Sequence, residues 1–415
     1  MIRDALILQK RELQKRLAER YVPREAQLRQ QDSNLVKVIM GPRRVGKSFF
    51  AIHQLSDFKG LGYVNFDDEK LAGLADYDEL LAAVDSVYEH PKILLLDEIQ
   101  NLPKWELFAN RLSRQGYNLF ITGSNAHLLS RELATHLTGR HTSIVLFPFS
   151  FPEYLKTTVS DKLTSSEKRQ KLEEYLEQGG YPEPLVKNLD RKEYLSTLFD
   201  SIIYKDILRR YKIRNPQGIM DLSQYLLSNT AKEFSYTSLT GIGHCKSVHT
   251  VQRYIGYLQE AYLFFTLSRF SYKMRNQAGE NKKLYCIDNG LVSAKAFQSS
   301  PDRGRRYENA VAIHLKYLES QGGFRLYYWR NAQNEEVDFV IYKDRAVSQL
   351  IQVCSDTSRQ KVREREVRAL LKASVELKCK DLLVLTADYE AAEEIEWFGI
   401  KGKVKFVPLW KWLTE

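Results

Sequence analysis

The chain has 415 residues, of which 43% are hydrophobic, so we expect two to four domains with buried cores. Lysine and arginine exceed aspartate and glutamate by 62 to 52, and the excess is concentrated in residues 1–30 and 265–306, which indicates either a nucleic-acid partner or a solvated charged surface. Four widely spaced cysteines and no long apolar run argue against a disulfide framework, a zinc site and a membrane span, so we expect a soluble cytoplasmic protein.

After an N-terminal helical segment at residues 1–30, the apolar run Val36–Met40 predicts a buried strand that leads into a glycine-framed loop. In such a loop, backbone N–H groups surround the phosphates of a nucleoside triphosphate, Lys47 reaches the β- and γ-phosphates, and the Ser48 hydroxyl ligates Mg²⁺. The predicted nucleotide-binding residues are Gly41, Pro42, Arg43, Arg44, Val45, Gly46, Lys47, Ser48 and Phe49.

A second buried strand is predicted at Ile93–Asp97, and two acids stand at its end. We expect Asp97 to hold the Mg²⁺ through water and Glu98 to polarise the water that attacks the γ-phosphate. Taken alone, an Asp-Glu pair would indicate only a capped, solvated strand end. The phosphate-binding loop fifty residues earlier favours the catalytic interpretation.

A third strand, Tyr117–Thr122, runs into Gly123-Ser124-Asn125, so Ser124 or Asn125 is predicted to sense the γ-phosphate or to hold the attacking water. Ordinary turn chemistry is the alternative. Two further strands, at 62–66 and 143–147, complete an α/β three-layer domain with a parallel sheet over residues 31–150. Arg140, just before the last strand, is the arginine that we expect to reach a γ-phosphate, in cis or from a neighbouring subunit, although most single arginines are surface residues.

These motifs resemble, in the same order, the archaeal and bacterial P-loop ATPase family related to AAA+ and STAND proteins. The likeness is carried by Gly41–Ser48, Leu96–Asn101 with Trp105, Ile121–Ala126, Leu133–Arg140 and Phe147–Phe151. It implies ATP and Mg²⁺ as cofactors and an extra strand between the strands that precede Gly41 and Asp97. It also implies a helical lid at residues 151–215, in which Gly179–Pro184 matches a glycine-x-proline element and Pro182 approaches the nucleotide base.

Residues 216–300 have a different organisation. Helical patterns at 222–230, 236–239 and 247–262 precede two strand-like runs, at 263–267 and 283–287, joined by a basic loop. Three helices and a basic hairpin predict a winged helix-turn-helix. Its DNA contacts would come from the third helix (His249, Gln252, Arg253) and from the wing (Lys273, Arg275, Lys282, Lys283). An intramolecular regulatory domain is an equally open alternative.

The C-terminal region, residues 301–415, begins with the basic linker Arg303–Arg306 and resembles the restriction-endonuclease-like α/β fold. In that fold a helix Glu, a strand Asp and an E/Q-x-K strand gather a divalent metal, and Glu308, Asp338 and Gln352 match the first three positions. Cys354 stands where the motif has lysine, and a thiol cannot supply that cationic charge. Lys361 or Lys372 could replace it, but a degenerate domain is the favoured interpretation.

Three hypotheses follow. The first is an ATP-binding protein whose slow, Mg²⁺-dependent hydrolysis switches the winged-helix and nuclease-like regions on nucleic acid. The second is an ATP-switched regulator that binds DNA, through the winged helix and the basic linker, or self-associates, with incidental turnover. The third is a metal-dependent nuclease. ATP or ADP is the expected small-molecule partner in the first two, with oligomerisation left open and no membrane partner.

Overall fold

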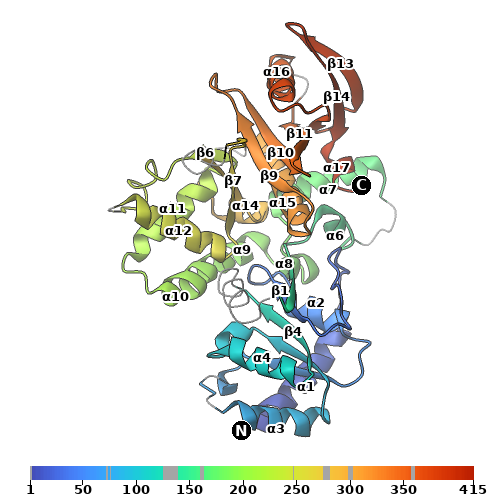
Figure 1. The fold of residues 1–415 in the computed structure, drawn as a ribbon, viewed down its shortest axis with the longest axis vertical. Coiled ribbons are helices and arrows are strands. Elements are labelled where there is room, and N and C mark those ends of the chain that lie inside the picture. Colours follow the sequence, from blue (N-terminus) through green and yellow to red (C-terminus); the bar gives the residue numbers. More distant parts are fainter. Residues whose placement is uncertain are drawn as a thin grey trace. The chain divides into compact units, whose positions relative to one another are not determined.

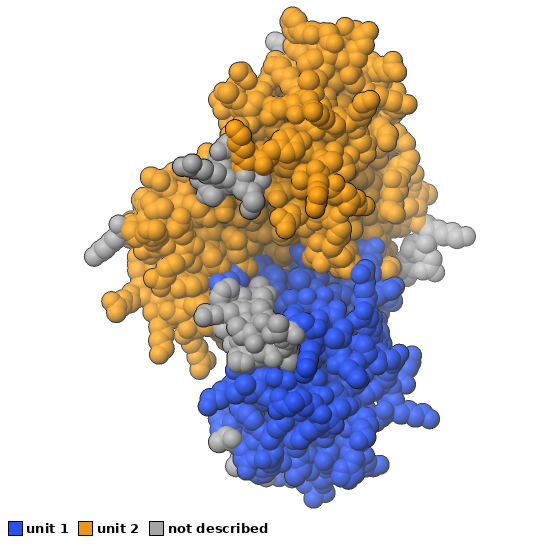
Figure 2. Space-filling model, viewed as in Figure 1, with its two compact units in different colours: residues 1–148, 186–188, 260–262 blue, residues 149–185, 189–259, 263–415 orange. Residues whose placement is uncertain are grey.

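The structure, a computed structural model, describes residues 2–71, 73–74, 76–124, 139–158, 163–245, 247–273, 281–297, 302–356 and 360–415. Their internal contacts divide the chain into two compact units, coloured separately in Figure 2. Unit 1 comprises residues 1–148, 186–188 and 260–262, and unit 2 comprises the remainder. Within the described ranges, no helix is both long and apolar enough to cross a bilayer.

Unit 1 is built on a five-stranded sheet in the order β2-β3-β4-β1-β5, and every strand pair in it is parallel. Figure 1 labels β1 and β4 of this sheet. The strands are β1 (Val36–Met40), β2 (Leu61–Asn65), β3 (Ile93–Asp97), β4 (Asn118–Gly123) and β5 (His141–Val145). All five predicted strands are thus confirmed. β4 lies between β1 and β3, which is the extra strand that the resemblance implied.

The helices of unit 1 connect these strands. They are α1 (Ile2–Ala18), α2 (Lys47–Gln54), η1 (Glu69–Leu71), α3 (Tyr77–Tyr88), η2 (Ile99–Asn101) and α4 (Trp105–Arg114). One face of α1 is buried, and on it the Gln9 side-chain amide donates to the Asn65 carbonyl at 3.1 Å and accepts from the Asn65 N–H at 2.9 Å. Because the strands are parallel, the segments that follow β1, β3 and β4 meet at one edge of the sheet.

Unit 2 begins with a group of helices. These are α6 (Phe151–Leu155), α7 (Ser165–Gln178), α8 (Pro182–Val186), α9 (Arg191–Ser201), the π-helix η3 (Ile202–Leu208) and α10 (Arg209–Tyr211). Gly180, between α7 and α8, is required for packing, because a Cβ there would lie 2.2 Å from the Phe149 carbonyl oxygen. Its N–H donates to the buried Asp288 carboxylate at 2.6 Å.

The middle of unit 2 contains the predicted hairpin within a three-stranded antiparallel sheet, ordered β6-β8-β7. Its elements are α11 (Pro216–Ser228), β6 (Lys232–Phe234), α12 (Val248–Glu260), β7 (Phe264–Ser268), β8 (Lys282–Cys286) and α14 (Asn289–Lys295). The short helix expected at 236–239 was wrong, since these residues form turns. β6 was not anticipated, because three residues are too few to show a strand period.

The C-terminal part of unit 2 is a six-stranded mixed sheet in the order β13-β14-β12-β11-β10-β9. Its elements are α15 (Arg303–Ser320), β9 (Arg325–Arg330), β10 (Glu336–Lys343), β11 (Ala346–Cys354), α16 (Gln360–Glu376), β12 (Leu382–Thr386), β13 (Ala391–Trp397), β14 (Ile400–Pro408) and α17 (Leu409–Trp412). The Phe270 N–H, just after β7, donates to the Tyr328 carbonyl at 2.7 Å, so the middle region is joined directly to this sheet.

Candidate active site

The loop Gly41–Ser48, here called the phosphate loop, has a backbone that only glycine permits at two points. Gly41 has φ 147°, and a Cβ there would lie 2.2 Å from the Leu146 carbonyl oxygen. Gly46 has φ 86° and immediately precedes α2. The loop therefore follows a parallel strand and opens a helix whose first N–H groups are available to phosphate oxygens, as the sequence predicted.

Lys47 is nearly buried at the start of α2, with 4% of its surface exposed. Its ammonium group donates to the Pro42 carbonyl at 3.0 Å and lies 3.8 Å from a Glu98 carboxylate oxygen. The first contact folds the side chain back over its own loop. A neutral carbonyl partner is exchanged for a phosphate oxygen at small cost, because a hydrogen bond to the charged phosphate is the stronger of the two.

Asp97 ends β3 as a fully buried carboxylate that accepts three hydroxyl donors. The Ser48 hydroxyl donates at 2.8 Å, the Tyr63 hydroxyl donates at 2.9 Å, and the Thr122 hydroxyl also donates. Burial and the neighbouring Glu98 raise the pKa of Asp97, while these hydroxyl donors oppose the rise. The Ser48 hydroxyl and the Asp97 carboxylate form a hard-oxygen pair that suits Mg²⁺, so the residues present fit the expected ion.

Glu98 sits beside this pair in a left-handed backbone conformation, with φ 51°, which directs it away from the line of the strand. One of its carboxylate oxygens accepts from the Gln100 amide at 2.5 Å and from the Ser124 hydroxyl at 3.1 Å. Burial raises the pKa of Glu98, but Lys47 and these donors outweigh it, so the net pKa lies below the ordinary value. Glu98 is therefore ionised at neutral pH, as a general base requires.

Several residues of this site were missed by the sequence analysis. Tyr63 and Thr122 hold Asp97, and the Thr122 hydroxyl also accepts the Glu98 N–H at 3.0 Å. The Arg24 guanidinium donates to the carbonyls of Val45, at 2.9 Å, and Phe147, at 2.5 Å, and so braces the phosphate loop from outside. No local pattern marks these residues, because each reaches the site from a separate segment.

Two aromatic rings stack on a histidine of α2. The His53 ring stacks on Tyr21, with ring centroids 4.1 Å apart, and on Phe49, with centroids 5.1 Å apart. Phe49 was predicted to contact the nucleotide, whereas Tyr21 and His53 were not. All three side chains are partly buried and belong to unit 1.

Three other predicted residues have different outcomes. Arg140 is exposed just before β5, whose first residue pairs with Val36 at the start of β1. The phosphate loop follows the other end of β1, and a five-residue strand is about 13 Å long. Because Arg140 lies near the first end, this placement disfavours its contact with a γ-phosphate bound to the same chain. Asn125 lies outside the described residues. Pro182 begins α8 in unit 2, and its approach to the nucleotide base stays a prediction.

In unit 2, the predicted metal residues Glu308 and Asp338 meet around a lysine. The Lys283 ammonium group lies 2.8 Å from Glu308, 2.5 Å from Glu336 and 3.1 Å from Asp338, and we call these four residues the Lys283 cluster. Lys283 is only 2% exposed, so its predicted contact with DNA phosphates was wrong. Burial and Asp338 raise the pKa of Glu308, while the carboxyl groups raise that of Lys283 against the effect of burial.

The other predicted members of this site are engaged elsewhere. The Gln352 side chain accepts the Asp338 N–H at 3.1 Å and donates to Glu366. Cys354 is buried in the hydrophobic core of the sheet, and burial raises its pKa to about 11. Lys372, expected to reach in, instead donates to both carboxylate oxygens of Glu335 at 2.9 Å. The side chain of Lys361 lies outside the described residues.

The residues predicted to contact DNA lie on α12 and on the hairpin formed by β7 and β8. His249, Gln252 and Arg253 are exposed, and the Arg253 guanidinium donates to the Tyr257 hydroxyl at 3.1 Å. Lys273 is exposed, Lys282 lies over the Tyr236 ring, and Arg275 lies outside the described residues. DNA contact by these residues stays a prediction.

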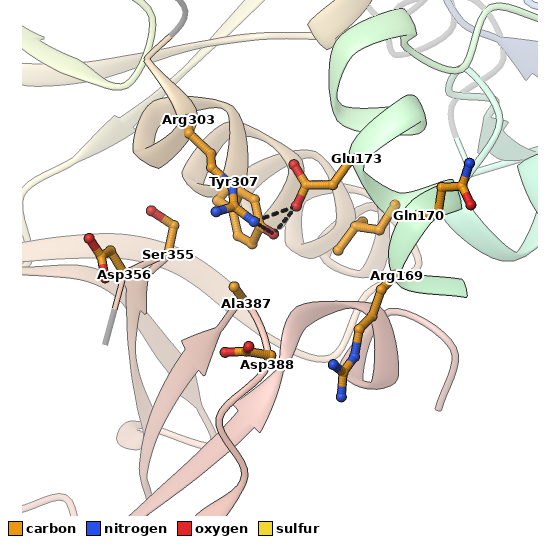
Figure 3. A pocket seen from close by; sticks show the side chains of 10 residues that line it. Arg169, Gln170, Glu173, Arg303, Tyr307, Ser355, Asp356, Ala387 and Asp388 are labelled. Atoms are coloured by element: carbon orange, nitrogen blue, oxygen red, sulfur yellow. Dashed lines mark hydrogen bonds and ion pairs between the residues drawn. The ribbon is translucent and has the colours of Figure 1, made fainter. Parts of the chain in front are cut away.

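A cavity of about 640 Å³ lies in unit 2 between α7, the start of α15 and the segments that follow β11 and β12 (Figure 3). Arg303 and Tyr307 of α15 both turn toward Glu173, which accepts from them at 2.6 and 2.5 Å. The remaining charged lining residues are Arg169, Asp356 and Asp388. With two arginines and three acids, the walls have little net charge with which to select an ion.

Comparison with known proteins agrees with this geometry. Residues 33–155 match the family model of an AAA domain, residues 169–302 match a domain of unknown function (DUF8612), and residues 303–412 match another (DUF4143). Among solved structures, a Walker-type ATPase of Pyrococcus abyssi is similar to this chain at 17% sequence identity and a TM-score of 0.45. The match covers 68% of this chain and 94% of the ATPase chain. The match to the AAA-domain model, together with the phosphate loop and the parallel sheet, identifies a P-loop ATPase-type domain in unit 1.

Two curated relatives extend over most of the chain. An uncharacterized protein of Haemophilus influenzae is 29% identical over 328 residues, covering 72% of this chain and 80% of the relative. The uncharacterized protein MJ1544 of Methanocaldococcus jannaschii is 34% identical over 403 residues, covering 91% of this chain and 88% of the relative. The chain therefore belongs to the same family as MJ1544.

Proposed function

We propose that this protein is a Mg²⁺-dependent ATPase that hydrolyses ATP slowly and uses its ATP or ADP state to control the region after residue 150. The observation that carries the proposal is the convergence of Lys47, Ser48, Asp97 and Glu98 at one edge of the parallel sheet. Few functions other than handling a nucleoside triphosphate require a cation, a hydroxyl and two acids around a glycine-framed loop.

Each group has a defined role in this proposal. The phosphate-loop N–H groups and Lys47 bind the phosphates. Ser48 and Asp97 would hold the Mg²⁺, which when bound would neutralise charge on the phosphate oxygens. Glu98 orients a water molecule and accepts its proton. Ser124 and Gln100 keep the Glu98 carboxylate in place, and Thr122 positions both acids through its single hydroxyl.

The test is ATP turnover by wild type, Lys47→Ala and Glu98→Gln, with ATP affinity measured in parallel. We expect both variants to lose turnover, Lys47→Ala with weaker ATP binding and Glu98→Gln with binding retained. Lys59→Ala, which changes an exposed lysine of the same unit, is the matched control and should turn over ATP like wild type. Equal rates in all four proteins would refute hydrolysis at this site.

Arg140 is proposed to act on a neighbouring subunit, since its position at the opposite edge of the sheet disfavours its own site. Mixing Arg140→Ala with Lys47→Ala tests this. If the arginine works in trans, mixed oligomers contain an intact phosphate loop facing an intact Arg140, and turnover recovers above that of either variant alone. No recovery in oligomers that demonstrably mix would exclude the role.

An ATP-switched regulator that binds DNA is the second candidate, and it is favoured by the exposed polar start of α12. It predicts that ATP changes affinity for duplex or single-stranded DNA even in Glu98→Gln, with affinity falling as salt rises. Substituting His249, Gln252 and Arg253 by alanine should weaken binding, whereas alanine at the buried Lys283 should not act through lost phosphate contacts. Absence of salt-dependent binding to either DNA form would remove this candidate.

A further inference from the structure

The Lys283 cluster is a buried charged group that the nucleotide site does not use. Its cation comes from β8, whereas its acids come from α15 and β10. A lysine ammonium group has three N–H donors, and here each has a carboxylate oxygen: Glu336 at 2.5 Å, Glu308 at 2.8 Å and Asp338 at 3.1 Å. The cation is therefore fully satisfied inside the protein.

We propose that Lys283 takes the place of a metal ion in this cluster, so that unit 2 is clamped by an internal cation and binds no catalytic metal there. A Mg²⁺ ion needs oxygen ligands at about 2.0–2.1 Å, and the oxygens that would supply them already converge on the ammonium group. Two cations cannot share that point. Among the residues that the structure describes, no group of three or more His, Cys, Asp or Glu side chains is arranged to hold a metal.

The surroundings support a clamp rather than an open site. Asp338 uses its second carboxylate oxygen to accept the Val353 N–H at 3.0 Å, which ties β10 to β11. The Tyr285 hydroxyl donates to Glu308 at 2.8 Å, next to the lysine on β8. With Lys283 2% and Asp338 6% exposed, the phosphate backbone of a nucleic acid cannot reach the ammonium group or the Asp338 carboxylate. The cluster thus fastens the β6-β8-β7 sheet to the C-terminal sheet.

The neighbouring backbone reinforces the same junction. The Asn309 side chain, one residue after Glu308, accepts the Cys286 N–H at 2.9 Å and donates to Asn289 at 2.8 Å. Glu233 of β6 accepts from Arg330 at the end of β9. These contacts join α15 to β8 and α14, and β9 to β6, by further hydrogen bonds, as a structural clamp requires. The proposal does not depend on ATP hydrolysis.

The experiment counts Mn²⁺ bound to the nucleotide-free, full-length chain by electron paramagnetic resonance. We expect no ion in the cluster of wild type. Lys283→Ser leaves three acids around a vacated space and should gain one Mn²⁺ per chain and a Mn²⁺-dependent rise in Tm. Lys283→Met, which fills the space without charge, and the neighbouring control Lys282→Ser should gain neither. Loss of a bound ion in Asp338→Asn would place that ion in the Lys283 cluster, and loss in Asp97→Asn would place it in the nucleotide site.

Two results would overturn the proposal. The first is a Mn²⁺ ion on the wild-type chain that Asp338→Asn releases, or metal-dependent DNA cleavage by wild type that Asp338→Asn abolishes. The second is a Lys283→Ser chain that is folded, as judged by its ATP binding and far-ultraviolet spectrum, yet gains no ion. The first measurement uses wild type and one acid variant, so it decides the matter even if Lys283→Ser does not fold.

Discussion

Lys47 of unit 1 and Lys283 of unit 2 are both buried beside acids, and the two lysines are held very differently. The Lys47 ammonium group lies 3.0 Å from a carbonyl oxygen and 3.8 Å from a carboxylate, whereas that of Lys283 has three carboxylates within 3.1 Å. Both are almost inaccessible to solvent. A cation whose nearest carboxylate lies 3.8 Å away can be drawn to a phosphate, while one held by three close carboxylates holds the fold together.

Residue type and burial therefore do not by themselves identify a binding site. The two lysines differ in how many carboxylates surround the ammonium group, one at 3.8 Å for Lys47 and three within 3.1 Å for Lys283. At the phosphate loop, donors and acids are arranged around a place for a ligand. In the Lys283 cluster they are arranged around each other.

Replacing each lysine by methionine contrasts the two directly. Lys283→Met leaves buried carboxyl groups unpaired and should lower the free energy of unfolding by about 3–5 kcal/mol. Lys47→Met should lower it by less, about 1 kcal/mol, because the nearest Glu98 carboxylate oxygen lies 3.8 Å away, yet it should abolish tight ATP binding. Denaturant unfolding and ATP titration of both variants provide the measurements. Similar stability losses would erase the distinction.

Two glycines test whether the place for the ligand is set by the backbone. Gly41→Ala puts a Cβ 2.2 Å from the Leu146 carbonyl oxygen and should distort the phosphate loop, weakening ATP binding by about 2 kcal/mol. At Gly46 the nearest atom to an added Cβ is 4.0 Å away, so Gly46→Ala meets only the strain of a positive φ, about 1 kcal/mol. ATP titration ranks them, and the reverse order would contradict the role given to Gly41.

A histidine of unit 2 that lies outside the Lys283 cluster tests how ordinary packing, without the clamp, contributes to stability. His314 of α15 contacts the Trp412 ring edge to face, with centroids 4.8 Å apart, and burial lowers its pKa to about 4. In the unfolded chain this histidine binds a proton below about pH 6.5, whereas in the folded chain it does so only below about pH 4. The free energy of unfolding therefore falls as the pH drops from 6.5 to 4.

Replacing this histidine with phenylalanine should therefore flatten the acid side of the stability profile by about 1–2 kcal/mol between pH 6.5 and 4.5. Urea unfolding at several pH values measures it, with Lys282→Ser as a control that keeps His314. An unchanged slope in His314→Phe would show that acid sensitivity comes from other groups.

The smallest effect concerns the support of Asp97. Tyr63→Phe removes one of the three hydroxyl donors without changing the ring, so Asp97 keeps its place but loses a 2.9 Å hydrogen bond. We expect ATP turnover to fall about fivefold, equivalent to about 1 kcal/mol, with the Mg²⁺ requirement shifted to higher concentration. Tyr88→Phe, which removes a hydroxyl that donates to the Tyr63 carbonyl, is the matched control and should leave turnover near that of wild type.

Much of the nucleotide site could be predicted because its signals are local. Gly41–Ser48 and Ile93–Glu98 are contiguous stretches in which strand, turn and acid follow directly from residue order, and all five strands of unit 1 formed where apolar runs indicated them. Tyr63, Thr122 and Arg24 could not be predicted. Their roles arise only when a parallel sheet aligns the ends of strands that are far apart in the chain.

The phosphate loop, the two acids after a buried strand and the positions of the strands along the chain could be predicted from the sequence, since each depends on short-range pattern and backbone geometry. The place of a strand between β1 and β3 was implied only by the family resemblance. Only the tertiary structure decided the fate of Lys283, which the sequence assigned to an exposed wing. Its partners are 25, 53 and 55 residues away, and a charge so deeply buried is tolerated only where folding brings opposite charges to it. Because these acids are far from Lys283 in the sequence, only the folded structure shows that Lys283 is part of a buried clamp and does not contact DNA.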